Sequence, residues 1–313
     1  MEKKVPLVSI ITVNYNDSAV TMDLLDSLRK ISYPALEIIV VDNASPSDDP
    51  TTIKESYPEV KLILSEENLG FAGGNNLGIR ASHGDFLFFI NNDTIVDDGL
   101  IEPLVETLQK DPEIGMVSPK IKFHWDPSLI QYAGYSPMNK WTIRNNSIGY
   151  HQKDNGLFDI PGETESIHGA AMMVSRRVVE QVGMMTEIYF LYYEEHDWAE
   201  MIKRAGYKVY YQPKGFILHK ESLATGKNSS LKTYYISRNR ILFARRNFKG
   251  PHLMVSLLFQ ALVSIPKNTL TFLLNGQTNH LIAFWRAVLW NLTHFKIDKK
   301  TRILRKRLLT STS

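Results

Sequence analysis

Four short, almost continuous apolar runs lie within the first 90 residues, and each is followed by polar residues. They are Val8–Asn14, Glu37–Val41, Val60–Leu64 and Phe86–Ile90. Such runs predict strands buried on both faces, and helical spacing between them, as in residues 18–30, predicts covering helices. The sequence therefore predicts an α/β fold with a mostly parallel central sheet and helices on both faces. Ligands of such sheets bind beyond the carboxyl ends of the strands.

The polar residues at those strand ends are the first candidates for a binding site. Asp42 could accept hydrogen bonds from a ribose or base, although an aspartate after a strand often serves only the turn. Asn91, Asn92 and Asp93 follow the fourth run, and Asp93 offers one hard oxygen ligand for Mg²⁺ or Mn²⁺. Residues 68–78 contain four glycines and three asparagines, which predict a turn that approaches a ligand closely. This segment matches neither a P-loop nor a dinucleotide fingerprint.

Three carboxylates lie together much later in the chain, at Glu194, Glu195 and Asp197, with aromatic residues on both sides. Like charges raise one another's pKa and aromatic surroundings penalise ionisation, so one of them could be a base near neutral pH. The alternative is the solvated first turn of a helix, where negative charge is favourable, and residues 198–206 resemble a helix that ends at a glycine. These residues alone do not decide between the two interpretations.

Composition narrows the class of protein. The chain has 313 residues, 43% of them hydrophobic, enough for a large α/β domain with an appendage or for two domains. It has no cysteine, which removes disulfides, thiolate metal sites and cysteine nucleophiles. The first residues run directly into a strand without an apolar signal segment, so we expect a protein that is not secreted.

Charge divides the chain near residue 222. Residues 1–221 carry 20 basic and 32 acidic residues, whereas residues 222–313 carry 16 basic residues and one acid, Asp298. We therefore expect a catalytic domain over residues 1–222 and a basic, helical region over residues 223–313. Nucleic acid could attract this charge, but no nucleic-acid module is recognisable and the first part is acidic. The predicted partner is an anionic membrane surface, not nucleic acid.

The apolar residues of the basic region fit a membrane surface better than a membrane span. Residues 253–265 are mostly apolar, but Pro266 and Lys267 interrupt the run, and a span needs about 20 predominantly apolar residues. The tail from Lys296 to Arg307 adds seven basic residues. We predict amphipathic helices in the membrane interface, with the tail bound to anionic headgroups. The alternative for residues 253–295 is a helical pair packed on the first domain.

Together the motifs occur in the order found in family 2 glycosyltransferases of the GT-A fold, which the chain resembles over residues 5–250. The segments that carry the resemblance are Val8–Asn16, Val41–Ser45, Asn68–Gly78, Phe89–Thr94, Gly169–Val174, Glu194–Trp198, Lys203–Val209 and Tyr234–Arg240. Within the family the chain particularly resembles the bacterial rhamnosyltransferase-like subgroup, which builds cell-surface polysaccharides. The resemblance implies a Rossmann-like nucleotide-diphospho-sugar transferase domain with a C-terminal helical extension.

The resemblance also implies which residues bind the donor, a dTDP- or UDP-sugar. Residues expected around the base and ribose are Thr12, Asn14 and Asp42, and residues expected to help close that pocket are Asn75 and Asn76.

A divalent metal, Mn²⁺ or Mg²⁺, is implied at Asp93, with Asn92 beside it reaching the ribose and diphosphate. Asn91 stands where the family's Asp-x-Asp motif often has its first aspartate. The site is therefore one charge poorer, and we expect no tight metal binding without nucleotide. His219 matches a position where some members have a metal-binding histidine, although a lone histidine is often structural.

For catalysis the resemblance implies an inverting single displacement that needs one base. Glu195 aligns best with the carboxylate that deprotonates the acceptor hydroxyl. Glu194 and Asp197 are expected to bind acceptor hydroxyls or hold the loop, and Asp197 remains the alternative base. Arg238 and Arg240 could bind the diphosphate, because guanidinium groups match phosphate geometry.

The predicted reaction is transfer of a sugar, L-rhamnose from dTDP-rhamnose, to a lipid-linked or polysaccharide acceptor. The predicted location is the inner face of the cell membrane, with peripheral attachment. Alternatives are transfer from a UDP-hexose or UDP-galactofuranose and, in another class, a noncatalytic nucleotide-binding or membrane-scaffolding protein. The presence of both Asp93 and Glu195 argues against the noncatalytic alternative. Donor, acceptor, linkage and oligomeric state are not determined by the sequence.

Overall fold

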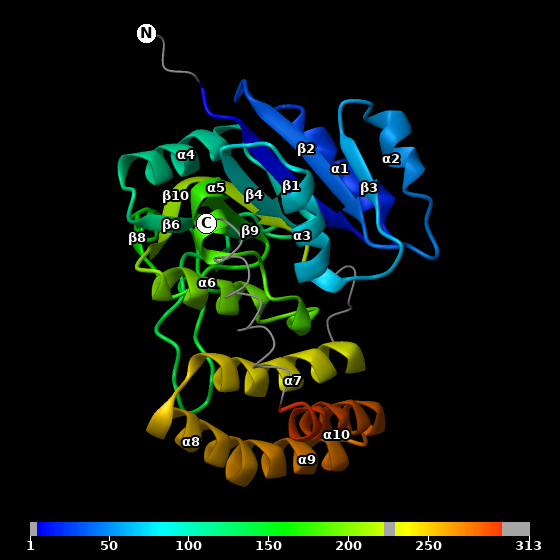
Figure 1. The fold of residues 1–313 in the computed structure, drawn as a ribbon, viewed down its shortest axis with the longest axis vertical. Coiled ribbons are helices and arrows are strands. Elements are labelled where there is room, and N and C mark those ends of the chain that lie inside the picture. The colour runs from blue at the N-terminus through cyan, green and yellow to red at the C-terminus, as the bar shows by residue number, and fades with distance from the viewer. Residues whose placement is uncertain (1–4, 222–228, 296–313) are drawn as a thin grey trace, which may run out of the picture. The chain divides into compact units, whose positions relative to one another are not determined.

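The computed structural model describes residues 5–221 and 229–295, and the chain divides into two compact units (Figure 1). Unit 1 comprises Met1–Pro137 and Asn145–Ala224, and unit 2 comprises Met138–Arg144 and Thr225–Ser313. The basic tail that we expect to bind membranes, residues 297–313, lies outside the described residues.

Unit 1 is built on a ten-stranded sheet in the order β3-β2-β1-β4-β9-β6-β10-β5, with β7 beside β6 and β8 beside β10. The strands are β1 (Val8–Asn14), β2 (Leu36–Asp42), β3 (Lys61–Leu64), β4 (Phe86–Ile90), β5 (Thr94–Val96), β6 (Ile114–Phe123), β7 (Ile130–Tyr132), β8 (Gly162–Glu163), β9 (Ala171–Ser175) and β10 (Lys208–His219). The first four are parallel, and so are β6 and β10.

The sheet is mixed, and its first four strands are parallel as predicted. Strand β9 runs antiparallel to both β4 and β6, and β5 runs antiparallel to β10. Strand β5 begins only a few residues after β4, but it pairs with β10 and not with β4. Periodicity within each run predicted the strands, but it carries no information about their directions.

Helices cover both faces of the sheet, as predicted. They are α1 (Ser18–Leu28), α2 (Thr51–Ser56), α3 (Gly70–Ala81), α4 (Ile101–Lys110), α5 (Arg176–Val182) and α6 (Glu194–Arg204). One apolar cluster joins α1, α2 and α4 to the sheet, and a second joins α3, α5 and α6. Neighbouring residues of β1 enter different clusters, Ile10 the first and Ile11 the second, because successive side chains of a strand point to opposite faces.

The glycine- and asparagine-rich segment forms helix α3, which corrects the predicted turn. Two of its glycines, Gly74 and Gly78, face β1. A Cβ atom on Gly74 would lie 3.0 Å from the side chain of Val13, and one on Gly78 would lie 2.3 Å from Cγ2 of Ile11. The missing side chains therefore let the helix approach the strand closely, so the close backbone approach is to the sheet and not to a ligand.

Strand β10 is a long strand with an irregularity near its middle. Its register against β6 shifts between Gln212 and Phe216, and Gly215 lies there at φ +79°. The strand ends at His219, which pairs with Phe123 of β6 on one side and Thr94 of β5 on the other.

Unit 2 is helical in its described residues. Its helices are α7 (Ser230–Asn247), α8 (Gly250–Phe259), α9 (Ile265–Leu274) and α10 (Thr278–Thr293). Helices α7 and α10 are joined by Arg245, which donates to the side-chain and main-chain oxygens of Asn291 at 3.0 and 3.1 Å. Ser256 of α8 donates to the carbonyl of Lys140, which assigns the loop 138–144 to this unit.

Pro266 does not interrupt the helix, contrary to our prediction. A π-helical segment, Gln260–Ser264, connects α8 to α9, and residues Gly250–Leu274 form one helix of 25 residues. Proline has no N–H to donate to the carbonyl four residues earlier, and its ring crowds that carbonyl. The π-helical turn before Pro266 widens the backbone at that point, so the helix accommodates the proline ring. By length and composition alone, this helix is long and apolar enough to cross a membrane.

Candidate active site

The carboxyl ends of β1, β2 and β4 meet in one network of polar side chains. Asn14 and Asp42 are partners in the register of β1 and β2, and Asn14 Nδ2 donates to Asp42 Oδ1 at 2.9 Å. Thr21 of α1 donates to Asn14 Oδ1 at 2.7 Å and accepts from Asn92 Nδ2 at 3.1 Å. The structure thus joins three predicted donor-binding residues through Thr21. Sequence reasoning missed Thr21, because a threonine within a helix carries no distinctive signal.

Asp42 and Thr12 are both buried, with different surroundings. Asp42 also accepts from the backbone N–H of Ser45 at 3.0 Å, so each carboxylate oxygen has a partner within the protein. Thr12 is fully buried in β1, and its hydroxyl has no hydrogen-bond partner in the described part of the chain. Contact of either residue with a base or ribose stays a prediction.

The side chains of Asn75 and Asn76 are engaged within the protein. Asn75 Nδ2 donates to the carbonyl of Phe71 at 2.9 Å. The amide of Asn76 clamps the segment after α5, donating to the carbonyl of Met185 at 3.0 Å and accepting from its N–H at 3.1 Å. These contacts account for both residues structurally, and their predicted role in closing the donor pocket is untested.

The structure brings Asp93 and His219 together, although 126 positions separate them in the sequence. Thr94 is paired with His219 across β5 and β10, which places the preceding residue, Asp93, beside the imidazole. Asp93 Oδ1 lies 3.2 Å from His219 Nε2, and both residues are buried. The antiparallel pairing of β5 creates this contact.

The environment of His219 suits a metal ligand. Its Nδ1 lies 2.8 Å from Oε1 of Gln131, so Nδ1 carries the hydrogen, and the amide of Asn91 lies 3.4 Å from Nε2. Nε2 therefore faces Asp93, and the oxygen of Gln131 orients the ring from its other side, as is usual for metal-binding histidines. Asp93 and His219 together offer one oxygen and one nitrogen ligand. No group of three or more such ligands occurs among the described residues, so a metal would need further ligands from the donor and water.

A further histidine, His168, lies beside this pair and was missed by sequence reasoning. Its ring centre is 5.7 Å from that of His219. Burial, followed by the charges of His219 and His196, lowers the pKa of His168 to about 3. The side chain is therefore neutral at physiological pH, and its Nδ1 accepts from the N–H of Ala170 at 3.1 Å.

The three predicted acidic residues lie in the first turn of α6 in different environments. Asp197 is fully buried, and its two oxygens accept hydrogen bonds from Thr186 Oγ1 at 2.7 Å and from the hydroxyl of Tyr189 at 3.1 Å. Glu194 is also buried. The side chain of Glu195 is 15% exposed and lies 3.8 Å from His196 Nε2, so it is the more accessible carboxylate.

Residues 168–170 connect the acidic turn to the Asp93–His219 pair. A Cβ atom on Gly169 would lie 3.8 Å from Cδ of Glu195, and the carbonyl of Ala170 accepts from the N–H of Asn91 at 3.0 Å. His168 stands at the other end of this segment, beside His219. Glu195 and His219, the partner of Asp93, therefore border the same short piece of chain.

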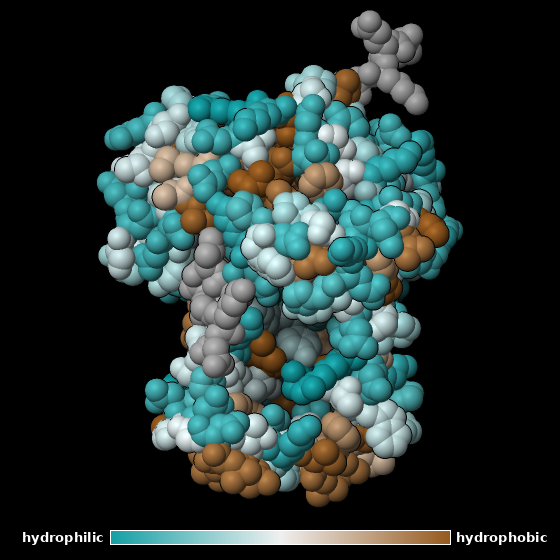
Figure 2. Space-filling view, turned by 180° about the vertical axis from the view of Figure 1, so that it is seen from behind, coloured by the Kyte–Doolittle hydropathy of each residue, from teal (hydrophilic) through white to brown (hydrophobic). Residues whose placement is uncertain are grey.

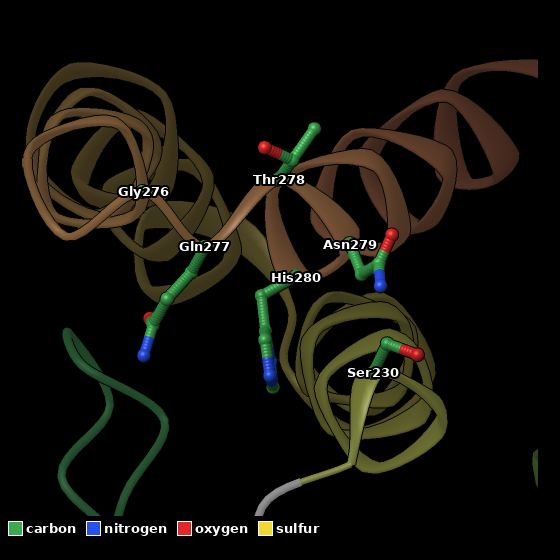
Figure 3. A pocket seen from close by; sticks show the side chains of 6 residues that line it. All are labelled: Ser230, Gly276, Gln277, Thr278, Asn279 and His280. Carbon is green, nitrogen blue, oxygen red and sulfur yellow. The ribbon is translucent and has the colours of Figure 1, made fainter.

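Arg238 and Arg240 belong to α7 of unit 2. The guanidinium of Arg238 is buried and stacks over the rings of Tyr235 and Trp290, 4.7 Å from each centre. This packing gives Arg238 a structural role within unit 2, and binding of diphosphate by either arginine stays a prediction. A polar pocket of the same unit lies at the turn between α9 and α10, beside Ser230 and His280, and its lining contains no predicted site residue (Figure 3).

Comparison with known proteins identifies the family of the chain. The model of glycosyl transferase family 2 matches residues 9–183. The chain is 28% identical over 281 residues to a low-salt glycan biosynthesis hexosyltransferase of Haloferax volcanii, covering 86% of this chain and 82% of that protein. It is 25% identical over 245 residues to the N-acetylglucosaminyl-diphospho-decaprenol L-rhamnosyltransferase of Mycobacterium tuberculosis, covering 70% of this chain and 78% of that protein.

Solved structures share the fold. A mannosyltransferase from Pyrobaculum calidifontis, in complex with GDP-Man and Mn²⁺, superimposes with a TM-score of 0.57 at 18% identity and covers 97% of this chain and 80% of its own. Residues 1–349 of TarS from S. aureus, in complex with UDP-GlcNAc, give 0.52 at 16% identity and cover 90% and 81%. The GT-A fold predicted from the sequence is therefore confirmed. Because the family model matches more than half of its length, the chain belongs to glycosyl transferase family 2 and is an enzyme that transfers sugars.

Proposed function

We propose that this enzyme is an inverting, divalent-metal-dependent transferase that moves L-rhamnose from dTDP-rhamnose to a lipid-linked acceptor in cell-surface glycan synthesis. The similarity to the rhamnosyltransferase-like subgroup supports the donor, and so does the mycobacterial relative, whose name gives an L-rhamnosyl donor and a diphospho-decaprenol acceptor. A hexose from a UDP-sugar is the second candidate. The Haloferax hexosyltransferase favours it, because that relative matches more of the chain.

The proposal depends most on the single piece of chain, residues 168–170, that joins the Asp93–His219 pair to Glu195. A displacement at a sugar carbon needs charge stabilisation on the leaving diphosphate and a base on the opposite face of the sugar. His219 lies beside His168 at one end of this segment, Asn91 bonds to Ala170, and Glu195 lies against Gly169. This arrangement supports a donor diphosphate at one end and an acceptor hydroxyl at the other.

Asp93 and His219 would hold the divalent cation, Mn²⁺ or Mg²⁺. The cation supplies positive charge that offsets the charge developing on the diphosphate. His219 presents its Nε2 beside the Asp93 carboxylate, and Gln131 accepts the hydrogen on Nδ1 and so orients the ring. With only two protein ligands, we expect metal affinity to depend on bound nucleotide.

Glu195 would act as the base. Its carboxylate accepts the proton of the acceptor hydroxyl while that oxygen attacks the anomeric carbon, and the bond to the nucleoside diphosphate breaks with inversion. The burial of Asp197 supports this choice, because both of its oxygens already accept hydrogen bonds. Asp197 would instead hold the turn in place.

Peripheral binding to an anionic membrane would bring the enzyme to its lipid-linked acceptor. Unit 2 exposes many large apolar side chains, and Figure 2 shows such residues gathered on its surface. The exposed large apolar side chains of α8, α9 and the segment between them are Met254, Leu258, Leu262, Val263, Leu270, Leu273 and Leu274. Those of α10 include Ile282, Leu289 and Leu292.

The opposite side of the long helix is polar. Ser256 and Gln260, one turn apart, are both buried, and Asn268 bonds to the carbonyl of Ser264. Residues 229–295 contain no acid and eight basic residues. An apolar face, a polar face and surrounding cations favour a helix that lies in the membrane interface over one that spans the bilayer.

A panel of donors would test the reaction. The full-length protein would be incubated with a diphospho-polyprenyl-linked sugar, Mn²⁺ or Mg²⁺, and dTDP-rhamnose, UDP-glucose, UDP-galactofuranose or GDP-mannose in turn. We expect dTDP-rhamnose to give the highest kcat/KM for release of nucleoside diphosphate, EDTA to abolish release, and NMR to show an inverted anomeric centre. A faster reaction with a UDP-hexose would replace the first candidate by the second, and a retained anomeric configuration would refute the proposed mechanism.

A further inference from the structure

The turn that leads into the acidic helix is strained. Phe190 lies at φ 63° and ψ −55°, Tyr192 at φ 68° and Tyr193 at φ 76°. Positive φ is unfavourable for aromatic residues, so the backbone is strained at each of these positions. Strain of this kind persists only where the surrounding structure holds it, and Tyr193 directly precedes Glu194 and Glu195.

Gly70, at the start of α3, holds the strained turn from one side. The carbonyl of Phe190 accepts from the N–H of Phe71 at 2.7 Å. A Cβ atom on Gly70 would lie 2.2 Å from the Phe190 carbonyl oxygen and 2.7 Å from its ring, and Gly70 itself is at φ +68°. This close backbone contact therefore requires glycine at position 70.

Asn43 holds residues 68–70, at the start of α3, from the donor side of the site. Its Oδ1 accepts from the N–H of Leu69 at 2.9 Å, and its Nδ2 donates to Asn68 Oδ1 and to the carbonyl of Gly70, at 3.0 Å in both cases. Asn43 is buried, it follows Asp42 directly, and its N–H donates to the carbonyl of Asn14 at 2.9 Å.

A continuous set of short contacts thus runs from the ends of β1 and β2 to the acidic turn, through Asn43, Gly70 and Phe190. We infer that these three residues are positioning residues, and that the bridge they form fixes Glu195 relative to the donor side of the site. The inference rests on the proposed role of Glu195 as base. Because a displacement of the base by about 1 Å is enough to slow a reaction as much as a hundredfold, loosening the bridge should reduce turnover more than donor binding.

The first test is Gly70→Ala, which pushes the Phe190 carbonyl away. We expect kcat to fall by about 10- to 100-fold while KM for the donor changes by less than about twofold. The matched control is Gly156→Ala, because Gly156 is also at positive φ, +89°, but a Cβ there meets only an ordinary contact at 3.8 Å. The control introduces the same kind of backbone strain without touching the bridge, and it should keep the wild-type kcat.

Phe190→Gly is the second variant, which decides the question if Gly70→Ala does not fold. Glycine relieves the strain at this position and cannot clash, so the variant should fold, but the turn loses its rigidity. We expect kcat to fall by about tenfold. Folded Gly70→Ala and Phe190→Gly variants that both retain the wild-type kcat would overturn the inference.

A double-mutant cycle with Glu195→Gln separates positioning from a merely structural role. If the bridge acts through Glu195, Gly70→Ala lowers kcat in the wild-type background but has little further effect once the base is removed. A full-sized additional loss in the Glu195→Gln background would show that the bridge acts elsewhere. If Glu195→Gln alone keeps the wild-type kcat, the proposed base is wrong, which is a separate result.

Discussion

Glu195 and Asp197 lie in the same helical turn, but they differ in solvent exposure and in hydrogen-bond partners. Glu195 is accessible, whereas Asp197 is fully buried and accepts two hydrogen bonds from neighbouring hydroxyls. Both residues carry a carboxylate in the same turn, so their solvent exposure and their hydrogen-bond partners are what distinguish the proposed base from the structural residue.

We predict that Glu195→Gln lowers kcat by at least roughly a hundredfold and leaves donor affinity and the thermal midpoint unchanged, since only the proton acceptor is lost. Asp197→Asn should instead lower the stability by about 1–3 kcal/mol, because an amide offers one acceptor where two buried hydroxyls need partners. Steady-state kinetics and thermal unfolding of both variants would check this. A wild-type thermal midpoint in Asp197→Asn together with a hundredfold loss of kcat would transfer the role of base to Asp197.

Asp93 should matter for binding of the metal and nucleotide together. We expect Asp93→Asn to weaken Mn²⁺-dependent binding of the nucleoside diphosphate at least tenfold, because the site loses its one charged ligand, and to change metal-free binding little. Titration calorimetry with and without Mn²⁺ would measure this, with the exposed-loop variant Asp126→Asn as control. Equal Mn²⁺ dependence in Asp93→Asn and wild type would remove Asp93 from the metal site.

His168 should make the stability depend on pH. Its pKa is about 3 in the folded protein, whereas the ordinary value is 6.5, so acidification protonates the unfolded chain first and favours unfolding. Each pH unit below 6.5 costs about 1.4 kcal/mol, or about 2 kcal/mol at pH 5. Urea unfolding at pH 7.5 and pH 5 should show a smaller acid loss in His168→Gln than in the wild type. The same loss in both proteins would contradict the assignment.

At the scale of elements, the contact between α3 and β1 depends on glycine. Gly78→Ala would put a Cβ atom 2.3 Å from Ile11 Cγ2 inside a filled core, and we expect a loss of about 1–3 kcal/mol of stability. Gly162→Ala, where a Cβ meets nothing within 4 Å, is the control. Chemical denaturation would measure both, and the loss should shrink in an Ile11→Ala background, which removes the obstructing methyl. No destabilisation in Gly78→Ala would mean that α3 can shift without cost.

Elements also show where local patterns mislead. Pro266 is a strong breaker in sequence, but the π-helical segment before it allows residues Gly250–Leu274 to continue as one helix. The glycines of α3 likewise look like a loop until the facing strand is known. In both cases a neighbouring backbone, and not the residue's own propensity, decides the conformation.

For the whole molecule we predict reversible binding to anionic membranes through unit 2. The double substitution Leu258→Asp with Leu262→Asp should lower affinity for phosphatidylserine-containing liposomes at least tenfold, because each leucine side chain buried in lipid contributes about 1.5–3 kcal/mol. Leu157→Asp, at an exposed apolar position of unit 1, is the control. Liposome sedimentation at low and high salt would measure both. Equal sedimentation of the double variant and the wild type would exclude this face.

The strands β1 to β4, the helices over both faces and the family could all be predicted from the amino-acid sequence. Hydrophobic periodicity reports burial directly, and the order of the polar strand ends carried the resemblance. The strand ends at Asn14 and Asp42 could be placed side by side in advance, because parallel neighbours end at one edge of a sheet.

The long-range contacts of the site could not be predicted from the sequence and follow from the folded structure. The contact of Asp93 with His219 depends on antiparallel pairing between segments far apart in the chain, and a local pattern does not encode pairing direction. The difference between Glu195 and Asp197 depends on which neighbouring residues bury each carboxylate. The requirement for glycine at position 70 comes from the Phe190 carbonyl beside it, which lies far away in the sequence. The residue type determines which contacts and reactions a side chain is capable of, but the distances within the folded protein determine which of them occur.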